Sequence, residues 1–150
     1  MLISTKGRYG LRSLADLVFY GQKKPVPLRV IAERQGISES YLEQVFALLR
    51  KAGIVNAIRG SYGGYVLARP AHQITVGEVL KALEGPLTLA SCASGGTTTE
   101  CDKMDTCLTI SFWQELSAKI DEVLSSTTLQ DLVDKVQAAR KGPDPRKDKN

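Results

Sequence analysis

The pattern of apolar and polar residues predicts three helices in the first third of the chain. Apolar residues recur at intervals of three and four over 5–20 and again over 28–35. The strongest pattern lies in 38–52, where apolar residues occupy positions i, i+3, i+4 and i+7: Leu42, Val45, Phe46 and Leu49. Ser38 or Ser40 can cap this third helix, and Ser40 with Glu43 has the spacing of a capping box.

Alternating character predicts a β-hairpin after the third helix. Residues 54–59 alternate, 60–64 have the turn sequence Gly-Ser-Tyr-Gly-Gly, and 65–68 form the second strand. The order of helix, short helix, glycine turn, longer helix and hairpin is that of a winged helix-turn-helix domain. We therefore predict a mainly α fold with one small β-hairpin.

The second half of the chain predicts a fourth helix over 75–83 and a Gly-, Ser- and Thr-rich loop over 91–106. A longer helix then begins at Thr109 or Ser111. Its apolar residues are spaced three, four and three apart, as in a coiled-coil seam: Trp113, Leu116, Ile120 and Val123. This stripe could be intramolecular core. We instead expect a dimer interface, because the fourth helix and a last helix over 127–139 should be too small to cover it.

Charge is distributed unevenly along the chain. The net charge is +4, yet 1–70 holds 11 Lys and Arg against 4 Asp and Glu, whereas 71–139 holds 4 against 10. The first balance is +7 and the second −6, which suggests a polyanion-binding module joined to something else. No apolar run approaches the ~20 residues of a membrane span, and the N-terminus lacks an apolar signal core. We expect a cytoplasmic protein.

A basic winged-helix domain is typical of DNA-binding proteins, because the start of the third helix can enter a major groove. The candidate groove contacts are Ser38, Ser40, Tyr41, Glu43 and Gln44. In the hairpin, Arg59 could enter a minor groove beside Gly60, Gly63 and Gly64. Phosphate contacts would come from Lys6, Arg8, Arg12, Arg50 and Lys51. Each residue alone could instead cap a helix, form a turn or lie on a solvated face.

Three cysteines lie close together in the sequence. Eight residues separate Cys92 from Cys101, and five separate Cys101 from Cys107. An odd, clustered set in a cytoplasmic chain favours metal or redox chemistry over a disulfide framework. Thiolates select an iron–sulfur cluster, zinc or copper(I) over hard ions. The alternative is free thiols, either as a redox switch or without function.

An enzyme is the least favoured class, because the chain has one histidine, His72, and no acid–base pair or cofactor fingerprint. The chain therefore divides into a DNA-binding domain, 1–84, and a cysteine-bearing loop, 85–107. Dimerisation helices follow over 108–139. The tail, 140–150, is charged and contains proline, and we expect it to be disordered.

Four stretches resemble the iron–sulfur-sensing winged-helix regulators, the family that includes IscR, NsrR and CymR: ISTKGRYGLRSL, VPLRVIAERQGISESYLEQVFALLRKAGIV, IRGSYGGYVLAR and ITVGEVLKALEG. The IscR branch is the most similar, and the resemblance covers residues 1–136. It implies a homodimer that binds a double-stranded DNA operator. It also implies an iron–sulfur cluster, of the 2Fe-2S type, on Cys92, Cys101 and Cys107. The family's groove and wing contacts fall on the residues named above, and the Glu43 position is implicated in choosing between operator classes.

The chain departs from this pattern at the fourth cluster ligand. The histidine position of the IscR branch is Ile110, and the aspartate position of the NsrR branch is Arg8. Candidate substitutes are acidic or hydroxyl side chains of the cysteine segment, or a small exogenous thiol: Glu100, Asp102, Asp105 and Thr109. The spacing between the first two cysteines is also longer than in the IscR branch, with an insertion around 95–99.

Two other functions stay open. One is a cluster-free repressor of cysteine or sulfur metabolism, like CymR, controlled by thiol oxidation or by a partner enzyme. The other is a protein-interaction module that uses the winged helix as a docking surface. In the favoured interpretation, changes in the cysteine loop shift the start of the dimerisation helix near Cys107 and alter how the two DNA-binding domains meet DNA.

Overall fold

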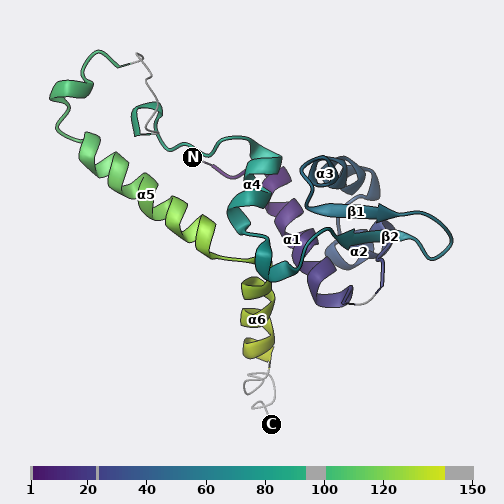
Figure 1. The fold of residues 1–150 in the computed structure, drawn as a ribbon. Helices are drawn as coiled ribbons and strands as arrows, with labels where there is room; N and C mark the ends of the chain where they lie inside the picture. The colour runs from purple at the N-terminus through teal and green to yellow at the C-terminus, as the bar shows by residue number, and fades with distance from the viewer. Residues whose placement is uncertain (1, 23, 94–100, 141–150) are drawn as a thin grey trace, which may run out of the picture.

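The computed structural model describes residues 2–22, 24–93 and 101–140. It confirms a mainly helical fold with one antiparallel hairpin. The elements are α1 (Thr5–Tyr20), α2 (Leu28–Gln35), α3 (Glu39–Lys51), β1 (Val55–Ile58), β2 (Gly64–Leu67), α4 (Val76–Glu84), α5 (Ile110–Ser126) and α6 (Leu129–Arg140). We call α1–α4, the hairpin and α6 the head. Helix α5 is the arm, and it runs away from the head in Figure 1.

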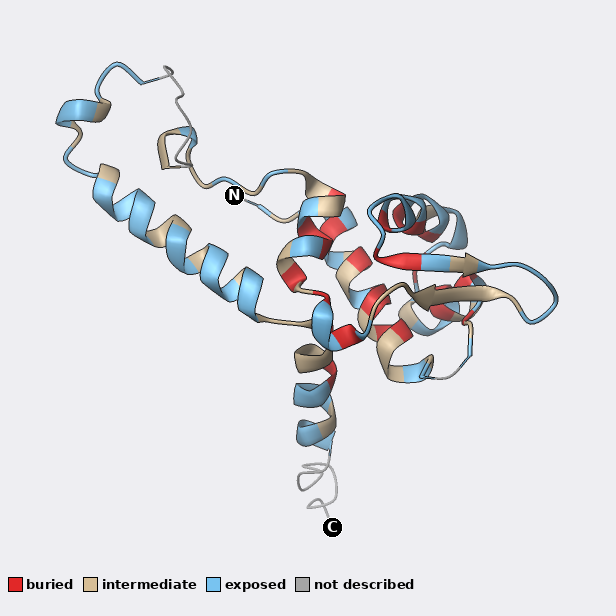
Figure 2. Ribbon diagram, viewed as in Figure 1, coloured by how far each residue is buried: buried red, intermediate tan, exposed pale blue. Residues whose placement is uncertain are grey.

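The core of the head forms around α3, as its sequence pattern predicts. Leu42, Phe46 and Leu49 are fully buried and Val45 is 1% exposed, so all four positions of the stripe face inward. They join buried apolar residues from the other head elements: Leu14, Ile31, Ile54, Ile74 and Leu129. Figure 2 shows that the buried residues gather in the head. This packing fixes the orientation of α3 and leaves its other face to solvent.

A buried carboxylate fastens α1 to α2. Asp16 on α1 accepts hydrogen bonds from the Arg34 guanidinium, at 2.6 Å from Nη2 and at 3.0 and 3.2 Å from Nε, and one from Gln35 Nε2 at 2.7 Å. The hydrogen bond with Asp16 raises the pKa of Arg34 above its ordinary value. The same guanidinium lies 4.1 Å from the centre of the Tyr20 ring. The short helix α2, and with it the start of α3, is therefore held in a defined position.

The hairpin is extended by a residue from the segment between α1 and α2. Strands β1 and β2 pair from Val55 with Leu67 to Ile58 with Gly64. Val26 forms a bridge on the other side of β2, with N–O distances to Tyr65 of 3.0 and 2.9 Å, and is 8% exposed. The pattern of 22–27 predicts only a polar loop, because a single bridging residue gives no periodic signal.

Helix α4 is fastened to α1 at the entrance to the cysteine segment. Glu84, its last residue, accepts hydrogen bonds from the hydroxyl of Ser4 and from the backbone N–H groups of Ser4 (2.8 Å) and Gly7 (3.1 Å). These bonds, the Ser4 hydroxyl first among them, lower the pKa of Glu84. Because the N–H groups at a helix start have no partner within the helix, the carboxylate also stabilises the first turn of α1.

The last helix lies on the head rather than on the arm. Leu129 is fully buried and Val133 is 4% exposed, and backbone hydrogen bonds join Thr127 to Val76 (2.8 Å) and Leu129 to Ile74 (2.9 Å). Helix α6 therefore belongs to the same core as α1, and a role of 108–139 in dimerisation stays a prediction. The expected tail, 140–150, overlaps α6 at Arg140, and 141–150 lie outside the described residues.

Two short 3-10 turns interrupt the expected loop, at Ser91–Ala93 and Met104–Thr106. Residues 94–100 lie outside the described part of the chain. Over the residues that the structure does describe, no helix has the length and apolar character needed to cross a membrane.

Candidate DNA-binding surface and cysteine segment

The start of α3 presents polar side chains to solvent. Ser38 is the N-cap and accepts a hydrogen bond from the backbone N–H of Tyr41 at 3.2 Å. The helix begins at Glu39, so Ser40 lies within its first turn and does not form the capping box that its spacing with Glu43 suggests. Ser40, Glu43 and Gln44 are all exposed. Their side chains therefore form a polar surface on the face of α3 opposite the buried stripe.

Tyr41 lies between the polar face of α3 and its buried stripe. Its half-buried ring contacts Tyr9 of α1 edge to face, with 6.1 Å between the ring centres and an angle of 83°. Arg12 lies 4.9 Å from the centre of the Tyr9 ring and donates a 2.7 Å hydrogen bond to the backbone oxygen of Gln35. Arg12 thus satisfies a carbonyl at the end of α2, although its residue type alone suggested a phosphate contact.

Four of the expected phosphate-contacting cations are exposed and lie in two pairs. Lys6 and Arg8 lie in the first turn of α1, whose side chains contact α3 through Tyr9 and Tyr41. Arg50 and Lys51 lie at the other end of α3, about 15 Å along its axis from Ser40 at 1.5 Å per residue. One pair of cations therefore lies at the start of α1, the helix that contacts Tyr41, and the other lies at the end of α3.

The wing turn is a tight structure that depends on glycine. Gly60 has a φ of +114°, and Gly63 closes the turn with a 3.0 Å hydrogen bond from its N–H to the oxygen of Gly60. A Cβ on Gly63 would lie 2.2 Å from the oxygen of Ile58, and one on Gly64 would lie 2.4 Å from the carbonyl carbon of Val26. Gly64 therefore makes room for the Val26 bridge rather than shaping the tip. Arg59 is exposed at the start of this turn.

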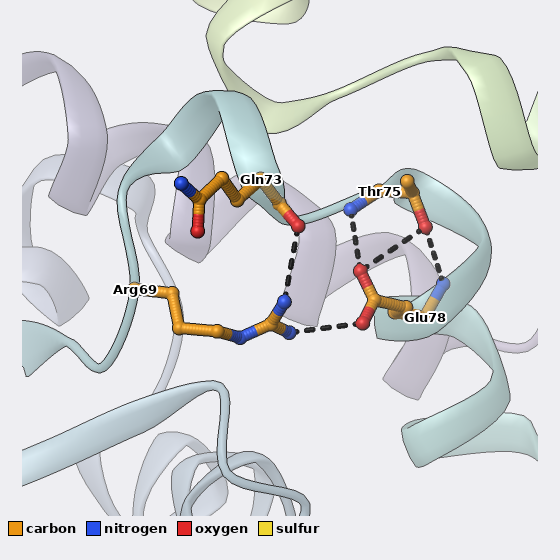
Figure 3. Close-up of polar contacts among 4 residues, drawn as sticks. All are labelled: Arg69, Gln73, Thr75 and Glu78. Carbon is orange, nitrogen blue, oxygen red and sulfur yellow. Dashed lines mark hydrogen bonds and ion pairs between the residues drawn. The ribbon is translucent and has the colours of Figure 1, made fainter.

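The base of the wing is joined to α4 by a polar network that the sequence analysis missed (Figure 3). Arg69 donates to the backbone oxygen of Gln73 at 3.0 Å and to Glu78 at 2.9 Å. Glu78 and Thr75 form a capping box, and the backbone N–H of Thr75 is the main cause that lowers the pKa of Glu78. The Thr75–Glu78 spacing was the available sequence signal. The network fixes the hairpin against the helix that leads to the cysteine segment.

The structure places the cysteines along the path from α4 to α5. Cys92 is half-buried, Cys101 is exposed, and Cys107 is half-buried three residues before α5 begins at Ile110. Over the described ranges, no group of three or more His, Cys, Asp or Glu side chains is positioned to hold a metal ion. Asp102 and Asp105 are exposed, His72 is exposed in a turn after the wing, and Glu100 lies outside the described residues.

Cys107 has contacts that link it to the arm. Its sulfur lies 3.4 Å from the Thr109 hydroxyl. Hydrogen bonds from that hydroxyl, and from the backbone N–H groups of Thr109 and Ile110, lower the pKa of the Cys107 thiol. Thr109 is the N-cap of α5 and makes no side-chain capping bond. The thiol therefore interacts with the unsatisfied donors at the start of the arm.

The donor chemistry of this segment fits a thiolate-ligated cluster in part. Three thiols on one segment supply three of the four ligands that a cluster needs. The two positions expected to supply the fourth hold Ile110, which opens α5, and Arg8 in α1. Neither side chain can ligate iron.

The arm exposes the predicted seam. No residue of α5 is buried, and Trp113 and Val123 are 38% and 62% exposed. Leu116 and Ile120 are half-buried. The end of the arm lies against α4, where a Cβ on Gly77 would be 3.0 Å from the Leu124 oxygen. Farther along, a cavity of about 920 Å³ lies between the arm, α4 and residues 86–93, lined by Lys81, Leu89, Ala118 and Asp121 among others. The head alone does not cover the arm.

Comparison with known proteins agrees with this architecture. The Rrf2 family, described as iron-dependent transcriptional regulators, matches residues 3–135. The chain belongs to the Rrf2 family. It is 42% identical over 133 residues to the HTH-type transcriptional regulator IscR of Vibrio campbellii, a match that covers 89% of this chain and 77% of that one.

Two solved structures are similar over nearly the whole chain. IscR of T. potens is 39% identical with a TM-score of 0.76, covering 98% of this chain and 96% of that one. CymR, the global cysteine regulator of B. subtilis, is 38% identical with a TM-score of 0.70, covering 90% and 98%. The resemblance predicted from the sequence is confirmed. The protein is a DNA-binding transcriptional regulator, not an enzyme.

Proposed function

We propose that this regulator binds operator DNA as a homodimer and senses iron–sulfur cluster or redox status through Cys92, Cys101 and Cys107. The observation that carries the proposal is the position of the cysteines. They lie between a winged-helix head and the arm, and Cys107 interacts with the first N–H groups of α5. Residues 1–84 would bind DNA, 85–107 would sense, and the arm within 108–139 would dimerise.

The head supplies the DNA contacts. Ser40, Glu43 and Gln44 would reach base edges in the major groove, with Ser38 and Tyr41 at the flanking backbone. Glu43 would accept from a cytosine amino group, and its carboxylate would repel phosphate where that partner is missing. Arg59 would enter the minor groove, and the remaining exposed cations would contact phosphates without regard to sequence: Lys6, Arg8, Arg50 and Lys51.

A second copy of the chain is the proposed cover for the arm. The stripe of Trp113, Leu116, Ile120 and Val123 has coiled-coil spacing, and these side chains are exposed or half-buried in the single chain. Two arms that pair through this stripe would bury it and would hold two heads at a fixed separation. Two heads that bind half-sites on one duplex need such a fixed separation.

The three cysteine thiolates would hold the cluster. The cluster supplies a group whose charge and presence respond to iron and oxidants. The fourth ligand would come from Glu100, Asp102, Asp105, Thr109 or a small exogenous thiol. His72 is unsuited, because it follows the wing on the other side of α4 from the cysteines.

The chain's own residues provide the coupling to the arm. A ligand or oxidation at the Cys107 sulfur would change the strength and geometry of its hydrogen bonds with Thr109 and with the N–H groups that open α5. The start of α5 would then shift, and the shift would change how the two heads fit an operator. A coupling free energy of ~1–3 kcal/mol would suffice for regulation.

A second candidate function is a cluster-free repressor of cysteine metabolism. The observation that favours it is Ile110 in place of a ligand, together with the similarity to CymR. In this case oxidation of Cys107, whose pKa is lowered, or a partner enzyme would control DNA binding.

The first experiment is purification without oxygen, followed by a visible spectrum and an assay of iron and acid-labile sulfide. We expect charge-transfer bands with matching iron and sulfide, and their loss when all three cysteines are changed to alanine. A colourless, iron-free protein after reconstitution would favour the thiol-controlled repressor. If DNA affinity depends on redox state in the triple variant as it does in the parent, the cysteines are the sensor in neither candidate function.

A further inference from the structure

The tip of the wing consists of Ser61 and Tyr62. The turn is closed by the hydrogen bond from Gly63 N–H to the Gly60 oxygen, and Gly63 lies against the backbone of Ile58. This tight closure leaves no space for a side chain beneath the turn. The Tyr62 side chain therefore projects outward, and it is 94% exposed.

Tyr62 differs from the other tyrosines of the chain. Tyr9, Tyr41 and Tyr65 each contact another ring, and Tyr20 contacts both Phe19 and the Arg34 guanidinium. Among the described residues, Tyr62 has neither an aromatic nor a cationic ring partner. A tyrosine ring is mostly apolar surface, so its full exposure to water is unfavourable. A partner that covers the ring would remove this cost.

Charge indicates the kind of partner. Residues 44–77, which contain the whole hairpin, hold four cations and not one Asp or Glu. Arg59 is exposed three residues before Tyr62 in the same turn. A cationic surface without carboxylates favours a polyanionic partner over a protein partner whose surface carries charges of both signs.

We infer that Tyr62 is a further DNA contact, which rests on the proposed function of the head. When Arg59 enters the minor groove, the wing tip meets the sugar–phosphate backbone at the groove's edge. The Tyr62 ring packs on deoxyribose, and its O–H donates to a phosphate oxygen. Such a contact adds affinity and positions the wing, but it carries no sequence information.

The experiment uses the full-length protein and duplexes recovered by selection from a random DNA library with the parent protein. Affinity is measured for the parent, Tyr62→Ala, Tyr62→Phe and Arg59→Ala. Val136→Ala is the matched control, because Val136 is an exposed apolar residue (45%) on α6, which points away from the wing (Figure 1). Circular dichroism confirms that each variant is folded.

We expect Tyr62→Ala to weaken binding about tenfold and Tyr62→Phe about twofold, since the ring supplies more of the contact than the hydroxyl. Tyr62→Ala should weaken selected and scrambled duplexes alike and leave the salt dependence of binding unchanged. Arg59→Ala should lower the slope of log K against log salt by about one, because it removes a charge. Hydroxyl-radical cleavage of the minor-groove edge beneath the wing should be blocked by the parent, by Tyr62→Phe and by Val136→Ala, but not by Tyr62→Ala.

The outcomes separate this inference from the proposed function. If the parent selects no duplex, DNA recognition by the head is itself wrong. Suppose that the parent binds DNA and that Arg59→Ala lowers the affinity, while Tyr62→Ala has the same affinity as the parent and as Val136→Ala. Then only the inference about Tyr62 is wrong. In that last case the exposed ring would belong to a protein partner instead.

Discussion

The head and the arm satisfy the same kind of sequence pattern in different ways. Helix α3 of the head buries four apolar residues in 13, whereas α5, with 17 residues, buries none. Both helices carry apolar residues at intervals of three and four. Periodicity therefore predicts that a helix face will be covered, but it does not predict whether the cover comes from the same chain.

Polar contacts show the same contrast. In the head, Asp16 is buried and accepts hydrogen bonds from Arg34 and Gln35, and Glu84 joins the end of α4 to the start of α1. The arm has an ion pair between Lys119 and Glu115 at 3.5 Å, with the two side chains 71% and 68% exposed. An ion pair that is so fully solvated contributes little. The head is specified by its own contacts, whereas the arm has few of its own.

The largest expected effect is on the free energy of unfolding, and it comes from comparing two phenylalanines. Phe46 in the head is fully buried and Phe112 on the arm is 55% exposed. We expect Phe46→Ala to lower the free energy of unfolding by about 3–5 kcal/mol. Phe112→Ala should lower it by less than ~1 kcal/mol, because little surface is lost. Urea denaturation followed by circular dichroism measures both. Equal losses would mean that the arm is covered as fully as the core.

The next effect concerns the seam itself. Ile120→Asp places a charge in the proposed interface, and we expect the dimer dissociation constant to rise at least ~100-fold, or ~2.7 kcal/mol. Sedimentation equilibrium gives the constant. Lys119→Gln, which also lowers the net charge by one and lies one residue away on a solvated position, is the charge-matched control. Dimers that survive Ile120→Asp would place the interface on another surface.

A smaller loss is expected where α1 meets α2. Asp16→Asn removes the charge that pairs with Arg34, whose own side chain is 29% exposed. Because solvent reaches the cation, we expect a loss of about 2 kcal/mol rather than the larger cost of a fully buried pair. Thermal unfolding measures it. Glu33→Gln, which alters the solvated ion pair with Arg29, should change stability by less than ~0.5 kcal/mol.

The smallest effect depends on pH. The pKa of Glu84 is lowered from its ordinary 4.5, so its contribution is present above that value and is lost as pH falls through the folded-state pKa. Glu84→Gln should cost about 1 kcal/mol at pH 7, a modest value because the carboxylate is partly solvated. The variant should show a smaller loss of stability between pH 5 and acid than the parent. Identical pH profiles would show that the contact between α4 and α1 contributes nothing.

The local features of the fold were predictable from the residues. The helix spacing, the stripe on α3 and the glycine turn each determine structure within a few residues, and the structure confirms the helix-turn-helix and hairpin order. Contacts between distant residues were not predictable. Val26 joins β2 across some 40 residues of sequence, and Ser38 rather than Ser40 is the cap because α3 begins at Glu39, two residues before the start that a Ser40 cap would give.

The candidate site divides in the same way. Residue types indicated the polar start of α3, Arg59 and the three thiols. They gave no sign that Arg12 caps α2, that Arg69 and Glu78 join the wing to α4, or that Tyr62 stands alone at the wing tip. Each of these depends on which side chains the tertiary fold brings within hydrogen-bond distance, or fails to bring.

The sequence by itself determined the secondary structure, the winged-helix order and the chemistry of the cysteine segment, because propensity, periodicity and residue type act over short distances. Only the tertiary structure decided that α6 completes the head while α5 stays uncovered. Both helices are amphipathic, and neither pattern distinguishes them. The choice came from the position of Ile74 and Val76, whose backbone bonds with Leu129 and Thr127 hold the start of α6 on the head, so that α6 and not α5 joins the core.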